Sequence, residues 1–261
     1  MATRRPRPGT ARRIPDPLPP ETPKEIVLRW LREGEIRLLG LIPWGSNATF
    51  LVALSDGERT GLAVYKPQRG EEPLWDFPHG TLCYREVAAY VVSEALGWGL
   101  VPPTVLREQG PYGRGALQLY IDADPEENYF TFREDPALQP VLMRLAAFDL
   151  ITNNADRKAG HCLRDRHGRI WAIDHGICFH VEPKLRTVIW DYRGQPIPED
   201  ILEEIRAFHR RLREDEGLRA ELAALLHPAE IAALERRTAA LLEHPVFPHP
   251  GPWRSVPWPM I

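Results

Sequence analysis

Residues 150–163, "LITNNADRKAGHCL", place many polar side chains between an apolar helical pattern and a strand pattern. Two asparagines, an aspartate, an arginine, a lysine and a histidine fall within nine residues. Turns are generally polar, so a solvated loop that caps the helix at Asn153 or Asn154 accounts for part of this composition. The alternative is a loop in which Asp156, Lys158 and His161 act on a substrate. The surrounding sequence has to decide between the two.

A second carboxylate follows in "WAIDHG", where Asp174 ends an apolar strand pattern just before Gly176. Asp156 and Asp174 are 18 residues apart, and the short hairpin expected between them brings the two positions close together. Carboxylates on neighbouring loops that follow strands commonly hold Mg²⁺ against phosphate groups. The two loops therefore predict a site for a phosphorylated ligand and a metal ion.

Two isolated charges lie upstream in otherwise apolar patterns. Lys66 ends the strand pattern "GLAVYKPQ", and Glu86 lies 20 residues later in the helical pattern of residues 81–98. Lys66 is either an edge residue that meets water or a cation held inside the protein for an anion. A carboxylate close to the core needs a cation as partner. We therefore predict that Lys66 pairs with Glu86, while Arg85 is a cation available to another neighbour.

A short turn in "PWGSNATFLV" places Gly45, Ser46 and Asn47 between two strand patterns. Such a turn can present backbone N–H groups to phosphate oxygens. Any hairpin also needs small residues at its turn. The composition therefore agrees with a phosphate-binding turn and with an ordinary hairpin.

These residues belong to a chain that divides into a tail and two lobes. A Pro- and Arg-rich tail over residues 1–24, which we expect to be disordered, precedes an N-lobe over 25–121 and a C-lobe over 122–261. A small β-rich lobe followed by a larger helical lobe predicts a two-lobed α+β fold.

Periodicity predicts the individual elements of both lobes. In the N-lobe we expect helices at 24–35 and 81–98, and strands at 36–44, 47–56, 59–68, 101–108 and 115–123. In the C-lobe we expect a mainly helical pattern from Pro136, one hairpin at 161–176, and final helices at roughly 198–215, 217–225 and 228–243.

The overall composition is that of an ordinary soluble globular protein. Of the 261 residues, 43% are hydrophobic and 26% are charged, as in typical soluble domains. No apolar run approaches the roughly 18 residues of a transmembrane helix, and the N-terminus lacks the apolar segment of a secretory signal. We therefore expect a cytoplasmic protein without stable membrane insertion. A net charge of −3 gives no general case for binding nucleic acid.

Three cysteines and several histidines raise the separate possibility of a zinc site. The three cysteines include no C-x-x-C pair, so a disulfide framework is not expected. Six possible ligands cluster within twenty residues: His161, Cys162, His167, His175, Cys178 and His180. Their spacing lacks the paired C-x2-4-C or H-x3-5-H of structural zinc sites, and a strand with alternate buried residues explains "HGICFH" equally well.

The ordered set of turn, strand lysine, helix glutamate and two Asp-centred loops resembles the protein-kinase-like superfamily in its atypical branches. "YREVAAYVVSEALGWGLVPPTVL" is similar to the helix and following strand of phosphatidylinositol 3-/4-kinase-like proteins of the type II sort and of HipA-like kinases. "ITNNADRKAGH" resembles their N-x-D-R catalytic loop, and "AIDHG" resembles their metal-binding D-x-G. The resemblance covers about residues 36–180.

For the nucleotide, the resemblance implies that Lys66 pairs with Glu86 and holds the α- and β-phosphates of ATP. The turn at Gly45, Ser46 and Asn47 would cover the phosphates. Adenine would rest against a hinge formed by Leu119, Tyr120 and Ile121.

For the transfer itself, the resemblance implies that Asp156 orients or deprotonates an acceptor hydroxyl and that Lys158 lies near the γ-phosphate. Asp174 would bind Mg²⁺. The family motif D-x-x-x-x-N has a metal-binding asparagine where this chain has His161, and imidazole suits Mn²⁺ or Zn²⁺ better than Mg²⁺. The site would be tolerant of Mn²⁺, or hold a single metal ion, or belong to a pseudokinase. Asn153 and Arg157 would hold the backbone of the loop.

Taken together, the sequence predicts a phosphotransferase that uses ATP with Mg²⁺ or Mn²⁺ and phosphorylates a hydroxyl of a small molecule, a lipid or a protein. The segment "CFHVEPKLRTVIWDYRGQPIP" lacks the A-P-E element of protein kinases, so a small polar metabolite is as good a candidate acceptor as a protein. The alternative function is a nucleotide-binding scaffold without turnover.

Overall fold

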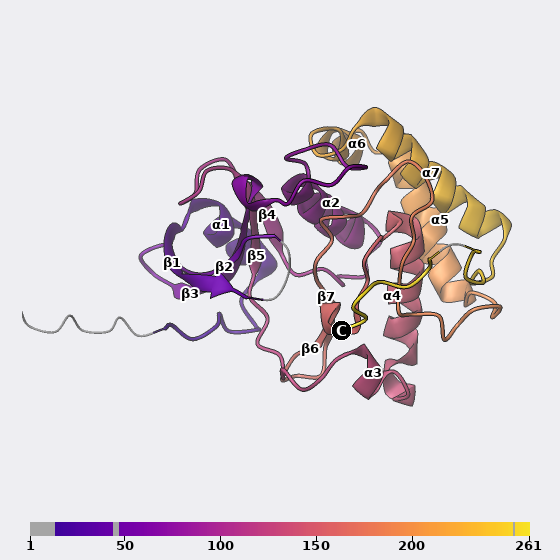
Figure 1. Ribbon diagram of the computed structural model, residues 1–261, viewed down its shortest axis with the longest axis horizontal. Helices are drawn as coiled ribbons and strands as arrows, with labels where there is room; N and C mark the ends of the chain where they lie inside the picture. The colour runs from indigo at the N-terminus through magenta and orange to yellow at the C-terminus, as the bar shows by residue number, and fades with distance from the viewer. Residues whose placement is uncertain (1–13, 44–46, 253) are drawn as a thin grey trace, which may run out of the picture.

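A computed structural model describes residues 14–43, 47–252 and 254–261. A β-rich N-lobe and a helical C-lobe lie side by side (Figure 1). The N-lobe contains a five-stranded antiparallel sheet in the order β1-β2-β3-β5-β4. Its elements are α1 (Lys24–Glu33), β1 (Glu35–Ile42), β2 (Thr49–Ser55), β3 (Thr60–Pro67), α2 (Leu82–Ala95), β4 (Thr104–Arg107) and β5 (Gly115–Leu119).

The two faces of this sheet pack against different parts of the protein. On one face α1 buries the apolar side chains Val27, Trp30 and Leu31, which recur at helical spacing, against the strands. Tyr65 of β3 belongs to that cluster. Because successive strand residues point to opposite faces, Lys66 points to the other face, on the side of α2 and the C-lobe.

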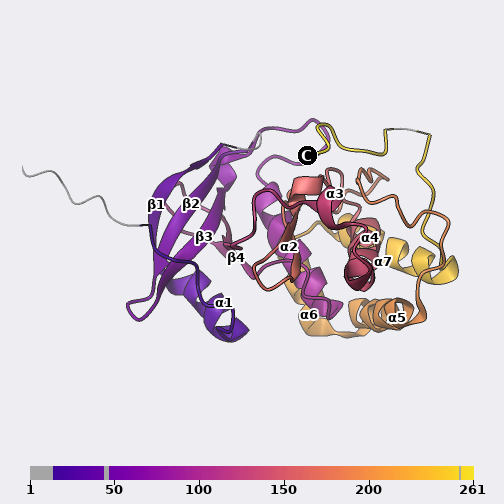
Figure 2. The same ribbon diagram turned by 90° about the horizontal axis from the view of Figure 1, so that it is seen from below.

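The C-lobe is built around α4, which is apolar on most sides and buried in the main core. Helix α7 packs beside it and α5 packs against α7, and Figure 2 shows the three together. The elements of this lobe are α3 (Tyr129–Phe132), α4 (Gln139–Thr152), β6 (Cys162–Arg164), β7 (Ile170–Ala172), α5 (Glu199–Glu214), α6 (Glu216–Ala223) and α7 (Pro228–Glu243). No helix in the described ranges is long and apolar enough to cross a membrane.

Helix α2 lies between the two lobes (Figures 1 and 2). Ala88 and Val92 pack into the large cluster that includes the C-lobe helices, while Cys83 and Val87 pack against Ala116 of β5. The helix is therefore enclosed on most of its circumference, which explains why its sequence shows few polar positions.

The predicted α+β architecture is confirmed, and most differences from the sequence expectation concern the boundaries of elements or short helices. The strand predicted at 101–108 begins only at Thr104, because Pro102 and Pro103 have no N–H group to pair. Helix α2 ends at Ala95 rather than 98, where Gly97 takes a left-handed φ of 75°. The four-residue helix α3 was not predicted.

Part of the predicted disordered tail has a described position. Residues 1–13 lie outside the described residues. Residues 14–23 contain no helix or strand, but Leu18 packs against the N-lobe core. A Cβ atom at Gly61 would come within 2.8 Å of the Leu18 side chain. This segment therefore lies against the sheet, and Lys24 already belongs to α1.

Candidate functional site

The site centres on Lys66, which leaves the end of β3 and contacts two carboxylates. Its Nζ atom donates to Glu86 of α2 and, at 3.1 Å, to Oδ1 of Asp174. Glu86 is buried, whereas the Asp174 side chain is 47% exposed. Burial alone would lower the pKa of Lys66, but the carboxylates of Asp174 and Glu86 outweigh it and raise that pKa. The lysine is therefore a fixed cation that joins α2 to the loop after β7.

Asp174 adopts an unusual backbone conformation, with a left-handed φ of 62°. Such a conformation is costly for a residue with a side chain and persists only where neighbours enforce it. Here Arg157 donates to the carbonyl of Ile173 at 2.8 Å, and the Ile173 N–H donates to the carbonyl of His161 at 3.0 Å. The loop that carries Asp156 thus holds the loop that carries Asp174.

His161 also contacts Asp174, with 3.2 Å between its Nε2 and Oδ2 of the carboxylate. The backbone N–H of Lys158 donates to its Nδ1 at 3.4 Å. Burial lowers the pKa of His161 to about 4, so the ring is neutral at pH 7. A neutral ring that accepts at Nδ1 carries its proton on Nε2, the atom that lies beside Asp174. A metal ion at Nε2 would have to replace this proton, and metal binding by His161 stays a prediction.

Asp156 lies on the neighbouring loop beside Lys158, with 3.3 Å between Lys158 Nζ and its Oδ2. The side chain of Asn154 accepts from the Asp156 N–H at 2.9 Å, which fixes the turn. Burial raises the pKa of Asp156 to about 6, although Lys158 acts against this shift. A carboxylate with such a pKa is suited to accept a proton near neutral pH.

A buried ion pair between Arg157 and Asp149 holds the loop that carries Asp156. The guanidinium of Arg157 donates from Nε to both oxygens of Asp149 at 3.1 Å, and both side chains are fully buried. Asn154 and Thr187 donate to the same carboxylate, each at 3.1 Å. These additional hydrogen bonds offset the cost of burying two charges. Arg157 thus holds backbone, as predicted, and also pairs with Asp149.

Asp149 is not among the site residues predicted from the sequence. The available signal was a carboxylate inside the apolar run "LAAFDLIT", eight residues before an arginine. A charge in such a run requires a buried partner. Arg157, in the polar loop of residues 150–163, is that partner.

Asn153 has two functions at once. It ends α4 in the left-handed conformation, with φ of 52°, as the solvated-loop alternative expects. Its side chain also donates to the carbonyls of His180 and Glu182 at 3.0 and 2.7 Å, and accepts from the Lys184 N–H at 2.9 Å. The helix cap therefore anchors the segment that follows the Asp174 loop.

Only Asn47 of the turn predicted to cover the phosphates belongs to the described residues. Gly45 and Ser46 lie outside the described residues. Asn47 accepts from the backbone N–H of Glu72 at 2.8 Å, and so contacts the β3–α2 connection. Its predicted contact with phosphate stays a prediction.

The hinge residues Leu119, Tyr120 and Ile121 line a cavity of about 450 Å³. Lys24 and Val27 of α1 line it too, together with Trp171 of β7, so the cavity opens on the α1 side of the sheet. The charged cluster around Lys66 lies on the opposite face and does not line it. We therefore do not take this cavity as the adenine site, and the place of adenine stays a prediction.

The possible zinc ligands do not converge. Among the described residues, no three His, Cys, Asp or Glu side chains form a group that suits a metal ion. His175 contacts the Arg157 guanidinium at 2.7 Å, and His180 contacts the carbonyl of Asp76 at 3.0 Å. Cys162 and Cys178 are buried free thiols. Each of these residues has a different structural surrounding.

The arrangement of the chain is that of a kinase-like fold. It is similar to the Golgi casein kinase with Mn and ADP bound, with a TM-score of 0.51, 14% identity, and 85% of this chain and 75% of that chain covered. It is equally similar to hydra Fam20 with sugar, with a TM-score of 0.51, 16% identity, and 83% and 86% covered. At these identities the likeness establishes the fold alone.

Sequence similarity defines the family more closely. No family model matches the sequence. The chain is 42% identical over 262 residues to protein Rv2133c of Mycobacterium tuberculosis, which covers 88% of this chain and 93% of that protein. The chain therefore belongs to the same family as Rv2133c.

Proposed function

We propose that this protein is an ATP-dependent phosphotransferase that moves the γ-phosphoryl group to a hydroxyl. One observation carries the proposal: Lys66 bridges a buried carboxylate and a half-exposed one, beside the loop of Asp156 and Lys158. Phosphoryl transfer requires an anchored triphosphate, neutralised charge and a positioned nucleophile, and these groups match those needs. The neighbour that holds Mn and ADP on the same fold adds support.

A divalent cation, Mg²⁺ or Mn²⁺, fits the side chains around Lys66. Asp174 is a half-exposed carboxylate whose pKa is lowered because, although burial alone would raise it, the cation of Lys66 favours the charged form. The Oε2 atom of Glu86 is buried without a hydrogen-bond partner among the described residues. Mg²⁺ in phosphotransferases is held by one or two carboxylates together with substrate phosphates, so a larger ligand set is not required. Asp174 would hold the cation, which neutralises phosphate charge when bound.

Each of the four residues Lys66, Glu86, Asp156 and Lys158 has its own role in the transfer. Lys66 neutralises phosphate oxygens and is kept in place by Glu86. The oxygen of the acceptor hydroxyl attacks the γ-phosphorus, the bond to the β-phosphate oxygen breaks, and ADP leaves. Asp156 accepts the hydroxyl proton, and Lys158 stabilises the charge on the transferred group.

The acceptor is a small molecule, a lipid or a protein that carries a hydroxyl. The absence of an A-P-E element from the sequence after Asp174 makes a small polar metabolite as good a candidate as a protein. The closer resemblance to phosphatidylinositol 3-/4-kinase-like and HipA-like kinases stays a prediction. Candidate acceptors can be compared by transfer of labelled phosphate from ATP.

The variant Lys66→Met tests the proposal, because it removes the central cation while keeping an unbranched apolar stem. We expect the parent to form ADP from ATP with Mn²⁺ or Mg²⁺, and ligand binding to raise its melting temperature by mass action. The variant should remain folded and lose turnover. Arg206→Met is the control, since Arg206 forms an exposed pair with Glu199 on α5 and contacts none of the residues of the site.

Two outcomes would contradict the proposal in different ways. Equal turnover in the parent and Lys66→Met would show that Lys66 has no part in the reaction. A parent that is stabilised by nucleotide but forms no ADP with either metal and any tested acceptor would favour the scaffold function. The protonated Nε2 of His161, which lies 3.2 Å from Asp174 where a metal ligand is expected, is the structural feature that favours this second candidate.

A further inference from the structure

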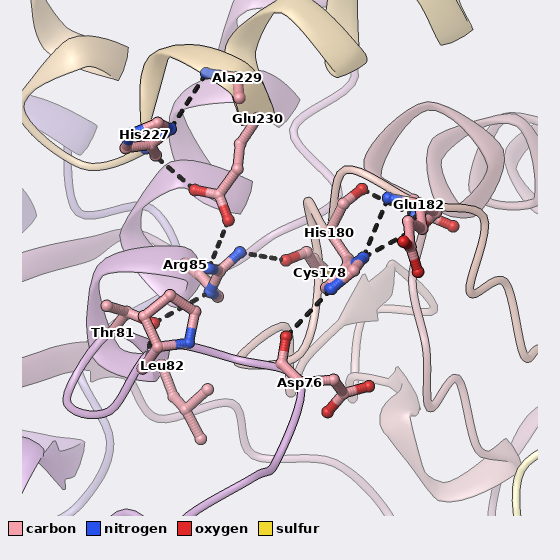
Figure 3. Close-up of polar contacts among 12 residues, drawn as sticks. Asp76, Thr81, Leu82, Arg85, Cys178, His180, Glu182, His227, Ala229 and Glu230 are labelled. Carbon is pink, nitrogen blue, oxygen red and sulfur yellow. Dashed lines mark hydrogen bonds and ion pairs between the residues drawn. The ribbon is translucent and has the colours of Figure 1, made fainter.

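Arg85 is the residue next to Glu86 on α2, and its long side chain is almost completely buried at 2% exposure. Its guanidinium reaches out of α2 into the C-lobe, as Figure 3 shows. It donates to the carboxylate of Glu230 at 2.5 Å and to the carbonyl of Cys178 at 2.7 Å. It also lies 4.9 Å from the ring centre of Phe77. A buried arginine held by an ion pair and a carbonyl hydrogen bond is fixed in one position.

The partner carboxylate is itself held in place. Glu230 lies in the first turn of α7, and its second oxygen accepts from the backbone N–H of His227 at 2.9 Å. The His227 ring accepts from the Ala229 N–H in return, which completes a capping box (Figure 3). The ion pair therefore joins α2 to the rigid beginning of a sixteen-residue helix.

The same contacts reach the loop that carries Asp174. Cys178 lies four residues after Asp174, and its carbonyl accepts from Arg85. Farther along α7, Arg237 donates to the carbonyl of His180 at 3.1 Å and to that of Ile151 at 2.9 Å. Helix α7 thus holds α2 through Glu230 and the segment after Asp174 through Arg237.

We infer that Arg85 is a positioning residue that fastens α2 to the C-lobe and thereby keeps Glu86 in contact with Lys66. With this link in place, the charged cluster is assembled within the single chain and requires neither a partner protein nor a modified residue to bring α2 inward. The effect on turnover rests on the proposed phosphotransferase function. The effect on the position of α2 does not.

The alternative is that Arg85 only stabilises the fold, and the test has to separate the two. The thiol of Cys83 provides a direct measure, because it is buried on α2 against Val87 and Ala116. If Arg85→Met releases α2, labelling of Cys83 by a maleimide under native conditions should accelerate by about tenfold or more, as local opening permits. Mass spectrometry of peptides distinguishes Cys83 from the other two cysteines.

A matched control exists in the C-lobe. Arg144 of α4 pairs with Asp200 and Glu204 of α5, at 2.8 Å to each, without contacting α2. Arg144→Met should therefore lower the melting temperature without exposing Cys83 or reducing kcat. For Arg85→Met we expect kcat for ADP formation to fall by about 10- to 100-fold, as for a misplaced catalytic group. Arg85→Lys, which keeps a donor and the charge, should be intermediate in both measurements.

The outcomes are separable. Parental labelling of Cys83 in Arg85→Met would overturn the inference, and so would equal labelling in Arg85→Met and Arg144→Met. If Arg85→Met does not fold, the comparison is made with Arg85→Lys and Glu230→Gln, which keep hydrogen-bonding groups in place. If the parent itself forms no ADP, the phosphotransferase proposal fails, while the labelling of Cys83 still decides the role of Arg85.

Discussion

Asp156 combines partial burial with a backbone that is held on both sides. The Arg186 N–H donates to the carbonyl of Asn154, and the Arg157 N–H donates to the carbonyl of Arg186, both at 2.9 Å. The carboxylate therefore cannot relax toward water by moving the loop. The raised pKa of Asp156 follows from this fixed position. Two measurements can test the raised pKa.

The first test is the pH dependence of the reaction. A general base must be unprotonated, so kcat/KM should rise with pH through a midpoint near 6, the pKa to which burial raises Asp156 in the protein without ligand. Asp156→Asn should lower kcat by about 10²-fold or more. Its remaining activity should no longer rise through pH 6, while nucleotide should still raise its melting temperature. A variant with parental kcat would exclude Asp156 as the base.

Stability provides the complementary measurement. Because its pKa is higher in the folded protein than the ordinary value of 3.8, the folded state binds more protons than the unfolded state between about pH 4 and 6. The contribution of this group to the free energy of unfolding is present at low pH and is lost as pH rises through 6. Asp156→Asn should therefore be at least as stable as the parent at pH 7.

His161 supports a second residue-scale prediction, on metal preference. An asparagine at this position offers a carbonyl oxygen, which Mg²⁺ prefers over imidazole nitrogen. His161→Asn should increase ADP formation with Mg²⁺ relative to Mn²⁺. The exposed His167 in the turn of the hairpin is the control, and His167→Asn should leave the ratio unchanged. An unchanged ratio in both variants would mean that His161 does not influence the metal.

At the scale of elements, the loop that carries Asp156 is connected to α4 by an ion pair. Asp149 lies in the helix and Arg157 in the loop, and neither has access to water. Asp149→Ala leaves a buried guanidinium without its carboxylate, which should lower the free energy of unfolding by about 3–5 kcal/mol. Urea denaturation measures this. Arg206→Ala, which breaks an exposed pair with Glu199, should change stability by less than about 1 kcal/mol, and an equal loss in both would contradict the argument.

The residues of the central cluster could be found from sequence because each interrupts a regular apolar pattern. Lys66 stands out in a strand and Glu86 in a helix, and strand and helix periods are local properties. The supports of the cluster are different. Arg85 and Glu230 are 145 residues apart, and each fits its own helix as an ordinary surface charge. Only the packing of α7 against the rest of the C-lobe brings them together, and no local period encodes that.

Across the whole molecule, residues 254–261 lie against the loop that carries Asp156. The Ala159 N–H donates to the carbonyl of Met260 at 2.8 Å, and the Thr187 N–H donates to that of Ser255 at 3.1 Å. Figure 1 shows the C-terminus beside β6 and β7. The described part of residues 248–261 contains no helix or strand. Its carbonyl groups nevertheless accept hydrogen bonds from Ala159, in the loop of Asp156, and from Thr187.

Removal of residues 254–261 should therefore affect the loop without unfolding the protein. We expect the amide hydrogens of Ala159 and Thr187 to exchange faster with deuterium, because their acceptors are lost. The Ala172 amide, which donates to the carbonyl of Leu100 at 2.8 Å, is an internal control and should keep its protection. Unchanged exchange at Ala159 and Thr187 would show that the terminal segment does not support the loop.

The alternation of β3 has a consequence for the evolution of this chain. Tyr65 belongs to the face under α1, and Lys66 belongs to the face of the cluster. An insertion or deletion of one residue between Thr60 and Lys66 would exchange the two faces and move the ammonium group among apolar side chains. Changes of length between homologues should therefore fall in the turn at residues 56–59, where Asp56 accepts from the N–H groups of Glu58 and Arg59. A change of length in this turn does not alter which residues of β3 point to each face of the sheet.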